Sequence, residues 1–178
     1  MLIVLAGRRI DAPDARVKRF PLAMKDVVYE RILELYKSER VTVLVSSAAC
    51  GADLLAQAAA RQLNIERHII LPFGRERFRI TSVIDRPGDW GNLFDEVCDE
   101  AEKTGNLTIM RGLSDAAEAY SAVTDELLRQ ANLIHLKDED ILAVAVWDGK
   151  VNDTTDFTSI FIDRARINKI DVRTISTE

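Results

Sequence analysis

Two arginines follow the first apolar run of the chain and are candidates for binding an anionic group. Arg8 and Arg9 come directly after Leu2–Ala6 and Gly7. A guanidinium group binds phosphate oxygens through paired hydrogen bonds, so this position favours a phosphate contact. The alternative is that both side chains form ordinary surface ion pairs with acidic helices.

A segment of small residues, Ser46–Leu63 (SSAACGADLLAQAAARQL), follows the second apolar run and is a second candidate ligand contact. Small side chains let a ligand, or only a neighbouring strand, approach the backbone. The first N–H groups of a helix have no intrahelical acceptor and attract anions. Asp53 suits a ribose hydroxyl better than a phosphate, unless it simply caps the helix. The candidate ligand contacts in this segment are Ser46, Ser47, Gly51, Ala52 and Asp53.

The stretch from Pro72 to Gly91 is long for a connection without clear periodicity, which favours a functional or mobile loop. It concentrates the arginines Arg75, Arg77, Arg79 and Arg86 and the aromatic residues Phe73, Phe78 and Trp90. If the first three arginines are extended, they point to one side and form a cationic flap over a ligand, with Arg79 as a contact. The alternative is a loop held by salt bridges with its aromatic side chains in the core.

A fourth group of polar residues, Asp148, Gly149, Thr154, Thr155 and Asp156, follows the apolar run Ile141–Trp147. Thr155 or Asp156 can cap the next helix, whose free N–H groups offer a second anion site. Carboxylates of this kind also bind magnesium, so a nucleotide ligand with magnesium is one expectation, although no metal-ligand set emerges. If the protein is an enzyme, the candidate acids are Asp53, Asp148 and Asp156.

The elements that must position these residues alternate along the chain. Short, continuous apolar runs are expected as strands, and amphipathic segments between them as helices. The expected strands are 2–6, 41–45, 68–71, 107–110, 141–147 and 172–175, and the expected helices are 22–38, 51–63, 90–103, 114–136 and 156–167. This pattern predicts an α/β fold: one domain, residues 1–178, with a doubly wound, mostly parallel sheet covered by helices on both faces. Ligands of such sheets bind at the carboxyl ends of the strands.

Composition narrows the classes of partner. The chain has 178 residues and a net charge of -5, which argues against general nucleic-acid binding. No apolar run is long enough to span a bilayer, so no membrane partner is expected. Two cysteines without a secretion signal indicate reduced thiols and a cytoplasmic protein. Leu127, Leu128, Ala131 and Leu133 supply either a homo-oligomer face or core packing.

The stretch VSSAACGAD resembles the signature V-S-G-x-A-x-G-x-D-x-x-A of the DNA-processing protein and Lonely-guy superfamily, often called SLOG. The opening IVLAGRR is similar to its strand-one turn, and LAVAVWDGKVNDTTDFTSIFIDRA resembles its late strand and helix start. The resemblance implies a Rossmann-like nucleotide-binding domain. It implies that Gly7 and Arg8 flank the ligand, that Ser46 and Gly51 shape the pocket above Asp53, and that residues 149–155 take the phosphate.

One departure from that superfamily separates the functional hypotheses. Its hydrolases carry P-G-G-x-G-T-x-x-E where this chain has Trp147–Thr155, and their catalytic glutamate has no counterpart here. Our first hypothesis is therefore a sensor or sequestering domain for a nucleotide-derived small molecule: a nucleoside monophosphate, an ADP-ribose-like compound or a cyclic nucleotide. The alternatives are a nucleotide-processing hydrolase of the Lonely-guy phosphoribohydrolase type and an oligomerisation or protein-interaction module.

Overall fold

A parallel sheet of six strands forms the centre of the protein. The computed structural model describes residues 1–112, 116–135, 140–151 and 156–178. Within these ranges every strand pairing is parallel, and the strand order is β4-β3-β2-β1-β5-β6. The strands are β1 (Leu2–Gly7), β2 (Val43–Ser46), β3 (Glu66–Leu71), β4 (Leu107–Ile109), β5 (Ile141–Trp147) and β6 (Asp171–Ser176).

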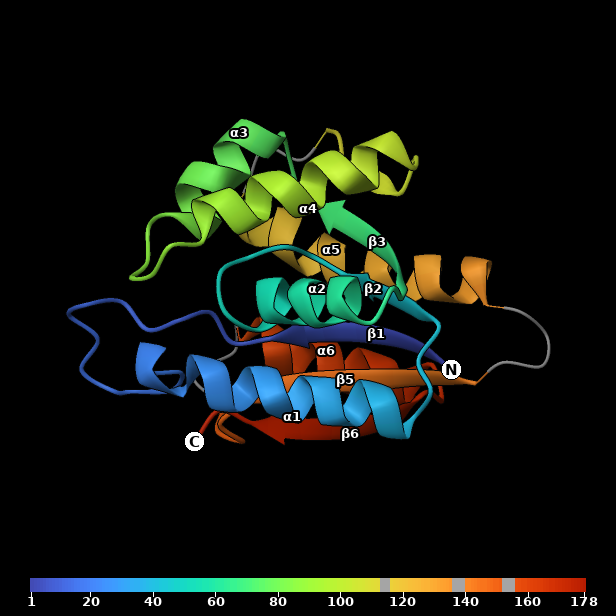
Figure 1. Cartoon of the computed structure of the whole chain (residues 1–178), viewed down its shortest axis with the longest axis horizontal. Coiled ribbons are helices and arrows are strands. Elements are labelled where there is room, and N and C mark those ends of the chain that lie inside the picture. Colours follow the sequence, from blue (N-terminus) through green and yellow to red (C-terminus); the bar gives the residue numbers. More distant parts are fainter. Residues whose placement is uncertain (113–115, 136–139, 152–155) are drawn as a thin grey trace.

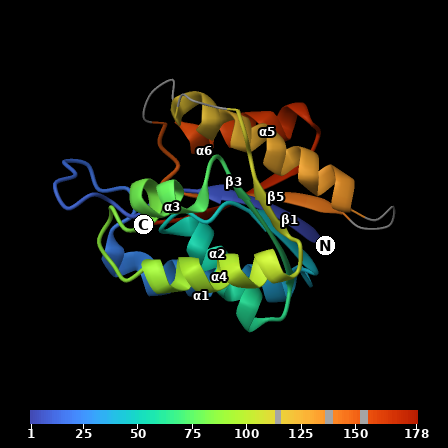
Figure 2. The same cartoon turned by 90° about the horizontal axis from the view of Figure 1, so that it is seen from above.

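Helices cover both faces of the sheet. α1, α2 and α4 lie on one face, and α5 and α6 lie on the other (Figure 2). The helices are α1 (Lys25–Ser38), α2 (Ala52–Gln62), α3 (Arg75–Phe78), α4 (Gly91–Lys103), α5 (Ala116–Ile134) and α6 (Phe157–Ile167). A 3-10 turn (Leu22–Met24) precedes α1, and a turn of π-helix (Arg79–Val83) follows α3.

The central strand explains why the apolar runs are continuous rather than alternating. Ile3 and Leu5 face the core beneath α1, α2 and α4, whereas Leu2 and Val4 face the core beneath α5 and α6. All four side chains are fully buried. A strand that is buried on both faces needs an apolar residue at every position, which is the pattern the sequence shows. The expected doubly wound α/β fold is confirmed.

The order of the strands creates a place for a ligand. β1 pairs with β2 on one side and with β5 on the other, and Gly7 lies opposite Val146. After β1 the chain passes through α1 to β2, and after β5 it passes through α6 to β6 on the opposite face (Figure 1). The connections that leave these neighbouring strands therefore diverge at their carboxyl ends. Clefts for ligands form at such a switch point.

The stretch from Pro72 to Gly91 differs from expectation, because it contains α3 and the π-helical turn rather than an irregular loop. Its arginines are not extended. Arg75 pairs with Asp99 at 2.6 Å, and Arg79 pairs with Asp95 at 3.0 Å. The aromatic residues Phe73, Phe78 and Trp90 are buried. The prediction of an extended cationic flap is therefore wrong: acidic side chains on α4 bind Arg75 and Arg79. The guanidinium of Arg77 lies over the ring of Phe73, and the aromatic rings belong to the core.

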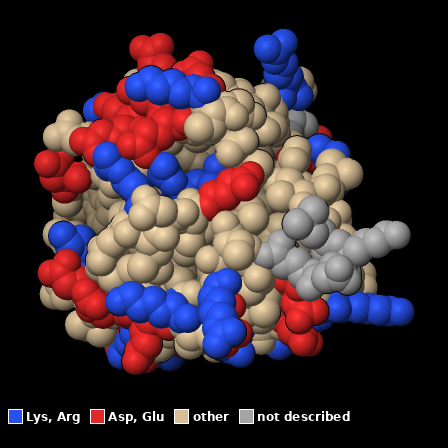
Figure 3. All heavy atoms as spheres, turned by 45° about the vertical axis from the view of Figure 1, so that its right-hand side comes forward, with Lys and Arg blue, Asp and Glu red and all other residues tan. Residues whose placement is uncertain are grey.

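Charges on the surface are mixed. Acidic and basic side chains are interspersed on the face shown in Figure 3. Among the described residues, no helix combines the length and apolar character that crossing a membrane requires. Both cysteines, Cys50 and Cys98, are buried free thiols.

Candidate functional site

A cleft of about 410 Å³ lies at the switch point. Residues from the carboxyl ends of β1 and β2 and from the first turns of α2 and α6 line it, together with one side of α5 and a residue after the π-helical turn. The lining residues are Leu5, Ala6, Gly7, Arg8, Arg9, Ser47, Ala49, Asp53, Arg86, Tyr120, Val123, Thr124, Leu127, Asp156, Phe157 and Thr158. This position is where a doubly wound sheet is expected to bind a ligand.

One part of the cleft is apolar and aromatic. Ala6 of β1 and Val123 and Leu127 of α5 supply its aliphatic side chains. The rings of Tyr120 and Phe157 lie with centroids 5.6 Å apart, inclined at 45°. Flat ligand rings pack well against such side chains.

Another part of the cleft is cationic. Arg9 forms an ion pair with Asp85, and Arg86 Nε lies 3.5 Å from a carboxylate oxygen of the same aspartate. Two guanidinium groups thus share one carboxylate. Burial works against the charge of Arg9, but interactions with Asp85 and Cys50 outweigh it, so the pKa of Arg9 is raised. Arg9 is therefore a permanent positive charge at the cleft.

Arg8, in contrast, is fully engaged within the protein. Its Nε donates to Asp148 at 3.0 Å, one terminal nitrogen donates to Asp156 at 2.8 Å, and the other donates to the carbonyl of Lys150 at 2.5 Å. Arg19 donates to the second oxygen of Asp148 at 2.8 Å. Asp156 also caps α6 by accepting from the N–H of Ser159. The two arginines and two aspartates make a buried, neutral network that ties the end of β1 to the β5–α6 connection.

The beginning of α2 is closed by the chain itself. The N–H of Ala52 donates to the carbonyl of Arg8 at 3.0 Å, and the N–H of Leu54 donates to that of Ala49 at 3.2 Å. A side chain at Gly51 would lie 2.7 Å from the Arg8 oxygen, and one at Gly7 would lie 2.5 Å from Ala52. Gly7 and Gly51 therefore make room for neighbouring parts of the chain, whereas the small residues Ser47 and Ala49 line the cleft.

Asp53 is a titratable group in the wall of the cleft. Its carboxylate accepts from the N–H of Ala49 at 3.2 Å, and only 8% of the residue is exposed. Burial raises the pKa of Asp53 to about 7, against the opposing effects of the Ala49 hydrogen bond and the charge of Arg9. Because that value lies near neutrality, Asp53 can either accept or release a proton under ordinary conditions.

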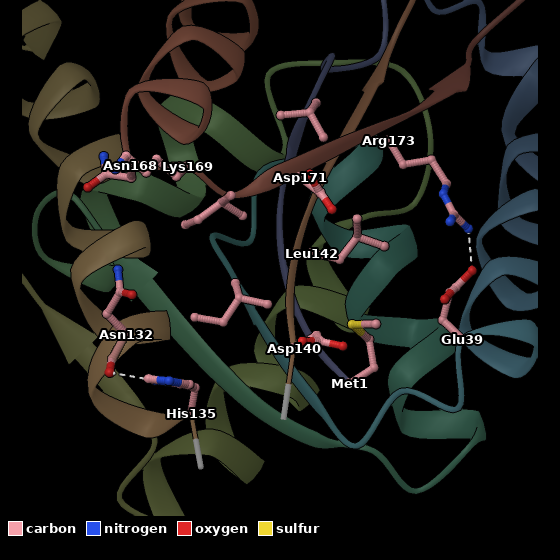
Figure 4. Close-up of a pocket in the computed structure, with 13 residues that line it drawn as sticks. Met1, Glu39, Asn132, His135, Asp140, Leu142, Asn168, Lys169, Asp171 and Arg173 are labelled. Atoms are coloured by element: carbon pink, nitrogen blue, oxygen red, sulfur yellow. Dashed lines mark hydrogen bonds and ion pairs between the residues drawn. The ribbon is translucent and has the colours of Figure 1, made fainter. Parts of the chain in front are cut away.

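A second hollow, of about 580 Å³, lies at the opposite ends of the strands, next to the amino ends of β1, β5 and β6 (Figure 4). Its side chains bind one another: Glu39 pairs with Arg173, and His135 Nδ1 lies 2.9 Å from the carbonyl of Asn132. Although it is larger, it lies away from the strand ends where parallel sheets bind ligands. We therefore place the candidate site in the cleft at the carboxyl ends of the strands.

Comparison with known proteins finds a neighbour among solved structures. No family model matches the chain, and no curated protein matches it. Among solved structures, the chain is similar to DNA processing protein A (DprA) from Streptococcus pneumoniae, with 13% identity and a TM-score of 0.42. The alignment covers 96% of this chain but 57% of the other, so the chain spans little more than half of that protein. A TM-score of 0.42 defines the fold no more closely than the strand order already does.

The structure brings some of the predicted site residues together and separates others. Gly7, Arg8, Arg9, Ser47, Asp53 and Asp156 line the cleft. Ser46, Gly51, Ala52 and Asp148 are buried and do not line it. Arg79 lies elsewhere, bound to Asp95, and Gly149 is exposed outside the lining. Thr154 and Thr155 lie outside the described residues. A role in ligand binding remains a prediction for these residues, with the exception of Arg79, whose side chain binds α4 away from the cleft.

Sequence reasoning missed the helical contribution to the cleft. Tyr120, Thr124 and Leu127 recur at a spacing of three or four residues, so they share one side of α5. That spacing was visible, but the sequence did not indicate which helix borders the switch point. Leu127, Leu128 and Ala131 are buried in the core, whereas Leu133 is 65% exposed. The first three therefore serve core packing rather than a dimer face.

The carboxylates near the cleft are the residues on which a metal site would depend. Across residues 1–112, 116–135, 140–151 and 156–178, no three His, Cys, Asp or Glu side chains gather as metal ligands. Asp148 and Asp156 instead point their carboxylates at Arg8.

Proposed function

We propose that the cleft binds a small nucleotide-type ligand, which the protein senses or sequesters. The observation that carries this proposal is the division of one cleft into an aromatic, apolar part and a part with two guanidinium groups. A nucleotide combines a flat, weakly polar base with an anionic phosphate and so matches both parts. The position at the switch point of a doubly wound sheet supports the same conclusion.

Each portion of such a ligand has a suitable counterpart. The base would pack against Tyr120 and Phe157, and the hydroxyl groups of Thr124 and Thr158 offer hydrogen bonds to its edge. Asp53 suits a ribose hydroxyl, either as an acceptor or, when protonated, as a donor. A volume of 410 Å³ is at the lower end of the range of roughly 300–1,000 Å³ that ligand pockets occupy. This size favours a mononucleotide over a dinucleotide such as NAD.

Thermal unfolding in the presence of ligands tests this proposal. The panel is AMP, GMP, cyclic mononucleotides, cyclic dinucleotides, ADP-ribose and NAD, each with and without magnesium. A ligand at one hundred times its dissociation constant stabilises the folded state by about 2.7 kcal/mol, which raises Tm by several degrees. We expect a mononucleotide to give the largest shift.

A matched pair of variants assigns the shift to the cleft. Ala6 is part of the cleft floor, so Ala6→Leu should fill it and abolish the ligand-induced shift. Ala58 lines a different groove, between α1, α2 and α4, so Ala58→Leu should leave the shift unchanged. If no member of the panel shifts Tm, the proposal fails, and an oligomerisation or protein-interaction module becomes the better hypothesis.

Hydrolysis of the N-glycosidic bond is a second candidate function, because Asp53 has the pKa of a usable general acid. Protonation of the leaving base by Asp53 would assist the reaction. Asp148 is poorly suited to this role, since Arg8 and Arg19 both bind its carboxylate. Chromatography of nucleoside monophosphates incubated with the protein tests the candidate. Release of free base that Asp53→Asn abolishes would support hydrolysis, and unchanged substrate would exclude it for the compounds tried.

A further inference from the structure

We propose that Arg9 and Arg86 form the phosphate-binding end of the cleft, and that Asp85 competes with the phosphate for them. This inference rests on the proposed function and deepens it, because it names the group that is recognised and the residues that recognise it. The expected ligand group is a single phosphate monoester or diester.

The geometry of the two arginines is the first observation. Both line the cleft, and each side chain is 28% exposed, so a ligand can reach them. Among the described residues, the Nε atoms of Arg9 and Arg86 are buried and have no hydrogen-bond partner. The 3.5 Å approach of Arg86 Nε to Asp85 is an ion pair without hydrogen-bond geometry. Because both Nε atoms are buried, a ligand in the cleft would meet the exposed part of each arginine side chain, and phosphate oxygens are strong acceptors for guanidinium groups.

Arg9 and the Asp85–Arg86 segment come from distant parts of the sequence and meet at the cleft. Arg9 follows β1, whereas Asp85 and Arg86 follow the π-helical turn Arg79–Val83. The carbonyl of Ser82 in that turn accepts from the N–H of Cys50 at 3.0 Å, and the Ser82 hydroxyl bonds to that of Tyr120. π-Helical turns are rare and are frequent at functional sites. Here the turn attaches the Asp85–Arg86 segment to both the β2–α2 connection and α5.

The other possible phosphate position, at the beginning of α6, is electrostatically unsuitable. The side chain of Asp156 already caps that helix and would repel a phosphate. Arg8, the nearest arginine, uses Nε and both terminal nitrogens on Asp148, Asp156 and a carbonyl. The charges of Arg8 and Arg19 balance those of Asp148 and Asp156, so the network offers no net attraction.

Charge at the Arg9–Asp85–Arg86 cluster indicates how many phosphates the ligand carries. Two guanidinium groups and one carboxylate have a net charge of +1. A phosphate diester carries a charge of -1, which balances the cluster, and a monoester carries about -1.5 to -2 at pH 7, which exceeds the charge of the cluster by no more than about one unit. A triphosphate would add negative charge close to Asp85 without a further cation among the described lining residues except Arg8, which is already engaged. The cluster therefore favours one phosphate.

Inorganic phosphate is the probe that tests this assignment without a base. We would titrate the full chain with phosphate at constant ionic strength, set with sodium chloride, and follow both Tm and the phosphorus NMR linewidth. Arg86→Gln should weaken phosphate binding at least tenfold, whereas Asp85→Asn should strengthen it at least threefold because the competing charge is gone. Arg79→Gln, which removes an arginine outside the cleft, should change nothing.

Two results would overturn the assignment. One is phosphate affinity that neither Arg86→Gln nor Asp85→Asn alters, both variants being folded by circular dichroism. The other is stronger binding in Asp156→Asn but not in Asp85→Asn, which would place the phosphate at the beginning of α6.

Using inorganic phosphate separates this inference from the proposed function. If nucleosides and nucleotides bind but the variants behave as wild type, only the phosphate assignment fails. If phosphate behaves as expected and no nucleotide binds, the assignment stands and the proposed function fails.

Discussion

The carbonyl oxygen of Arg8 lies directly against Gly51, at a distance that excludes any side chain there. A Cβ at Gly51 would be 2.7 Å from that oxygen, and Gly51 also has a φ of +98°, which L-residues rarely adopt. The next residue, Ala52, donates its N–H to the same oxygen at 3.0 Å. This contact holds the end of β1 against the start of α2, and it therefore determines where Arg8 and Arg9 lie after the strand ends.

Replacing Gly51 should therefore destabilise the protein for two reasons at once. Gly51→Ala places a side chain in a left-handed backbone conformation and against a carbonyl that cannot move freely. Gly105→Ala is the matched control, because Gly105 has a φ of +76° but open space around it. We expect Gly51→Ala to lower the free energy of unfolding by about 2 kcal/mol more than Gly105→Ala, measured by urea denaturation. Equal effects would show that the contact with Arg8 yields without cost.

The buried network around Arg8 should be sensitive to loss of its central cation. Arg8→Met leaves Asp156 without its guanidinium partner and Asp148 with only Arg19. Removing one partner of a buried ion pair typically costs about 3–5 kcal/mol, and we expect a loss of that order. Arg164→Met, which breaks an exposed pair with Asp125, should cost less than about 1 kcal/mol.

A second change distinguishes electrostatic from packing effects at Arg8. Adding Asp156→Asn to Arg8→Met removes the carboxylate that has lost its guanidinium partner, while Asp148 stays paired with Arg19, so part of the lost stability should return. No recovery would mean that Arg8 acts through the packing of its side chain, for example against Trp147, whose ring centroid lies 5.6 Å from the guanidinium.

The fold was predictable because its signals are local and repeated. Ile141–Trp147 is an unbroken apolar run, and the expected strand has the observed bounds of β5. The expected helix 156–167 differs from α6 by one residue, because Asp156 is the N-cap. Burial on both faces of a parallel sheet leaves this pattern in any sequence, whatever the protein binds.

The site was only partly predictable because it depends on pairings between distant segments. The position of Arg8 after β1 indicated a phosphate contact, but its partners, Asp148 and Asp156, follow β5 and become neighbours only when β5 pairs with β1. Similarly, Arg79, and not Arg86, was the ligand contact expected from the sequence. The side chain of Arg79 binds Asp95 on α4, whereas that of Arg86 lines the cleft. Charge and spacing do not distinguish such cases, because the acidic partner is known only from the packing.

The hydroxyl of Tyr120 should contribute to stability through Ser82. Tyr120→Phe keeps the ring in the cleft but removes the bond to the Ser82 hydroxyl, which belongs to a fully buried residue. We expect a loss of about 1–2 kcal/mol in the free energy of unfolding. Tyr29→Phe loses an exposed bond to Gln62 and should have almost no effect. Similar small values for the two variants would indicate that Ser82 finds another partner, such as Thr81.

The raised pKa of Asp53 should make stability depend on pH. In the unfolded chain the pKa of an aspartate is near 3.8, and in the folded protein burial raises the pKa of Asp53 to about 7. Below about pH 4 the carboxyl is protonated in both states, so its burial carries no charge penalty. Between about pH 4 and pH 7 the folded state binds more protons than the unfolded state, and the free energy of unfolding therefore falls as the pH rises. Above about pH 7 the penalty is constant.

Asp53→Asn measures this penalty directly. The amide retains an oxygen that accepts from the N–H of Ala49 but does not ionise. Urea denaturation at pH 5, 6, 7 and 8 should show that the wild type loses about 2–3 kcal/mol relative to Asp53→Asn across this range. A constant difference due to the buried amide does not affect that slope. Asp26→Asn changes a side chain that is 89% exposed, so its free energy of unfolding should vary with pH as that of the wild type does. If the free energy of unfolding of Asp53→Asn also varies with pH as that of the wild type does, Asp53 is ionised from pH 5 to pH 8. A role for Asp53 as the proton donor in hydrolysis is then excluded.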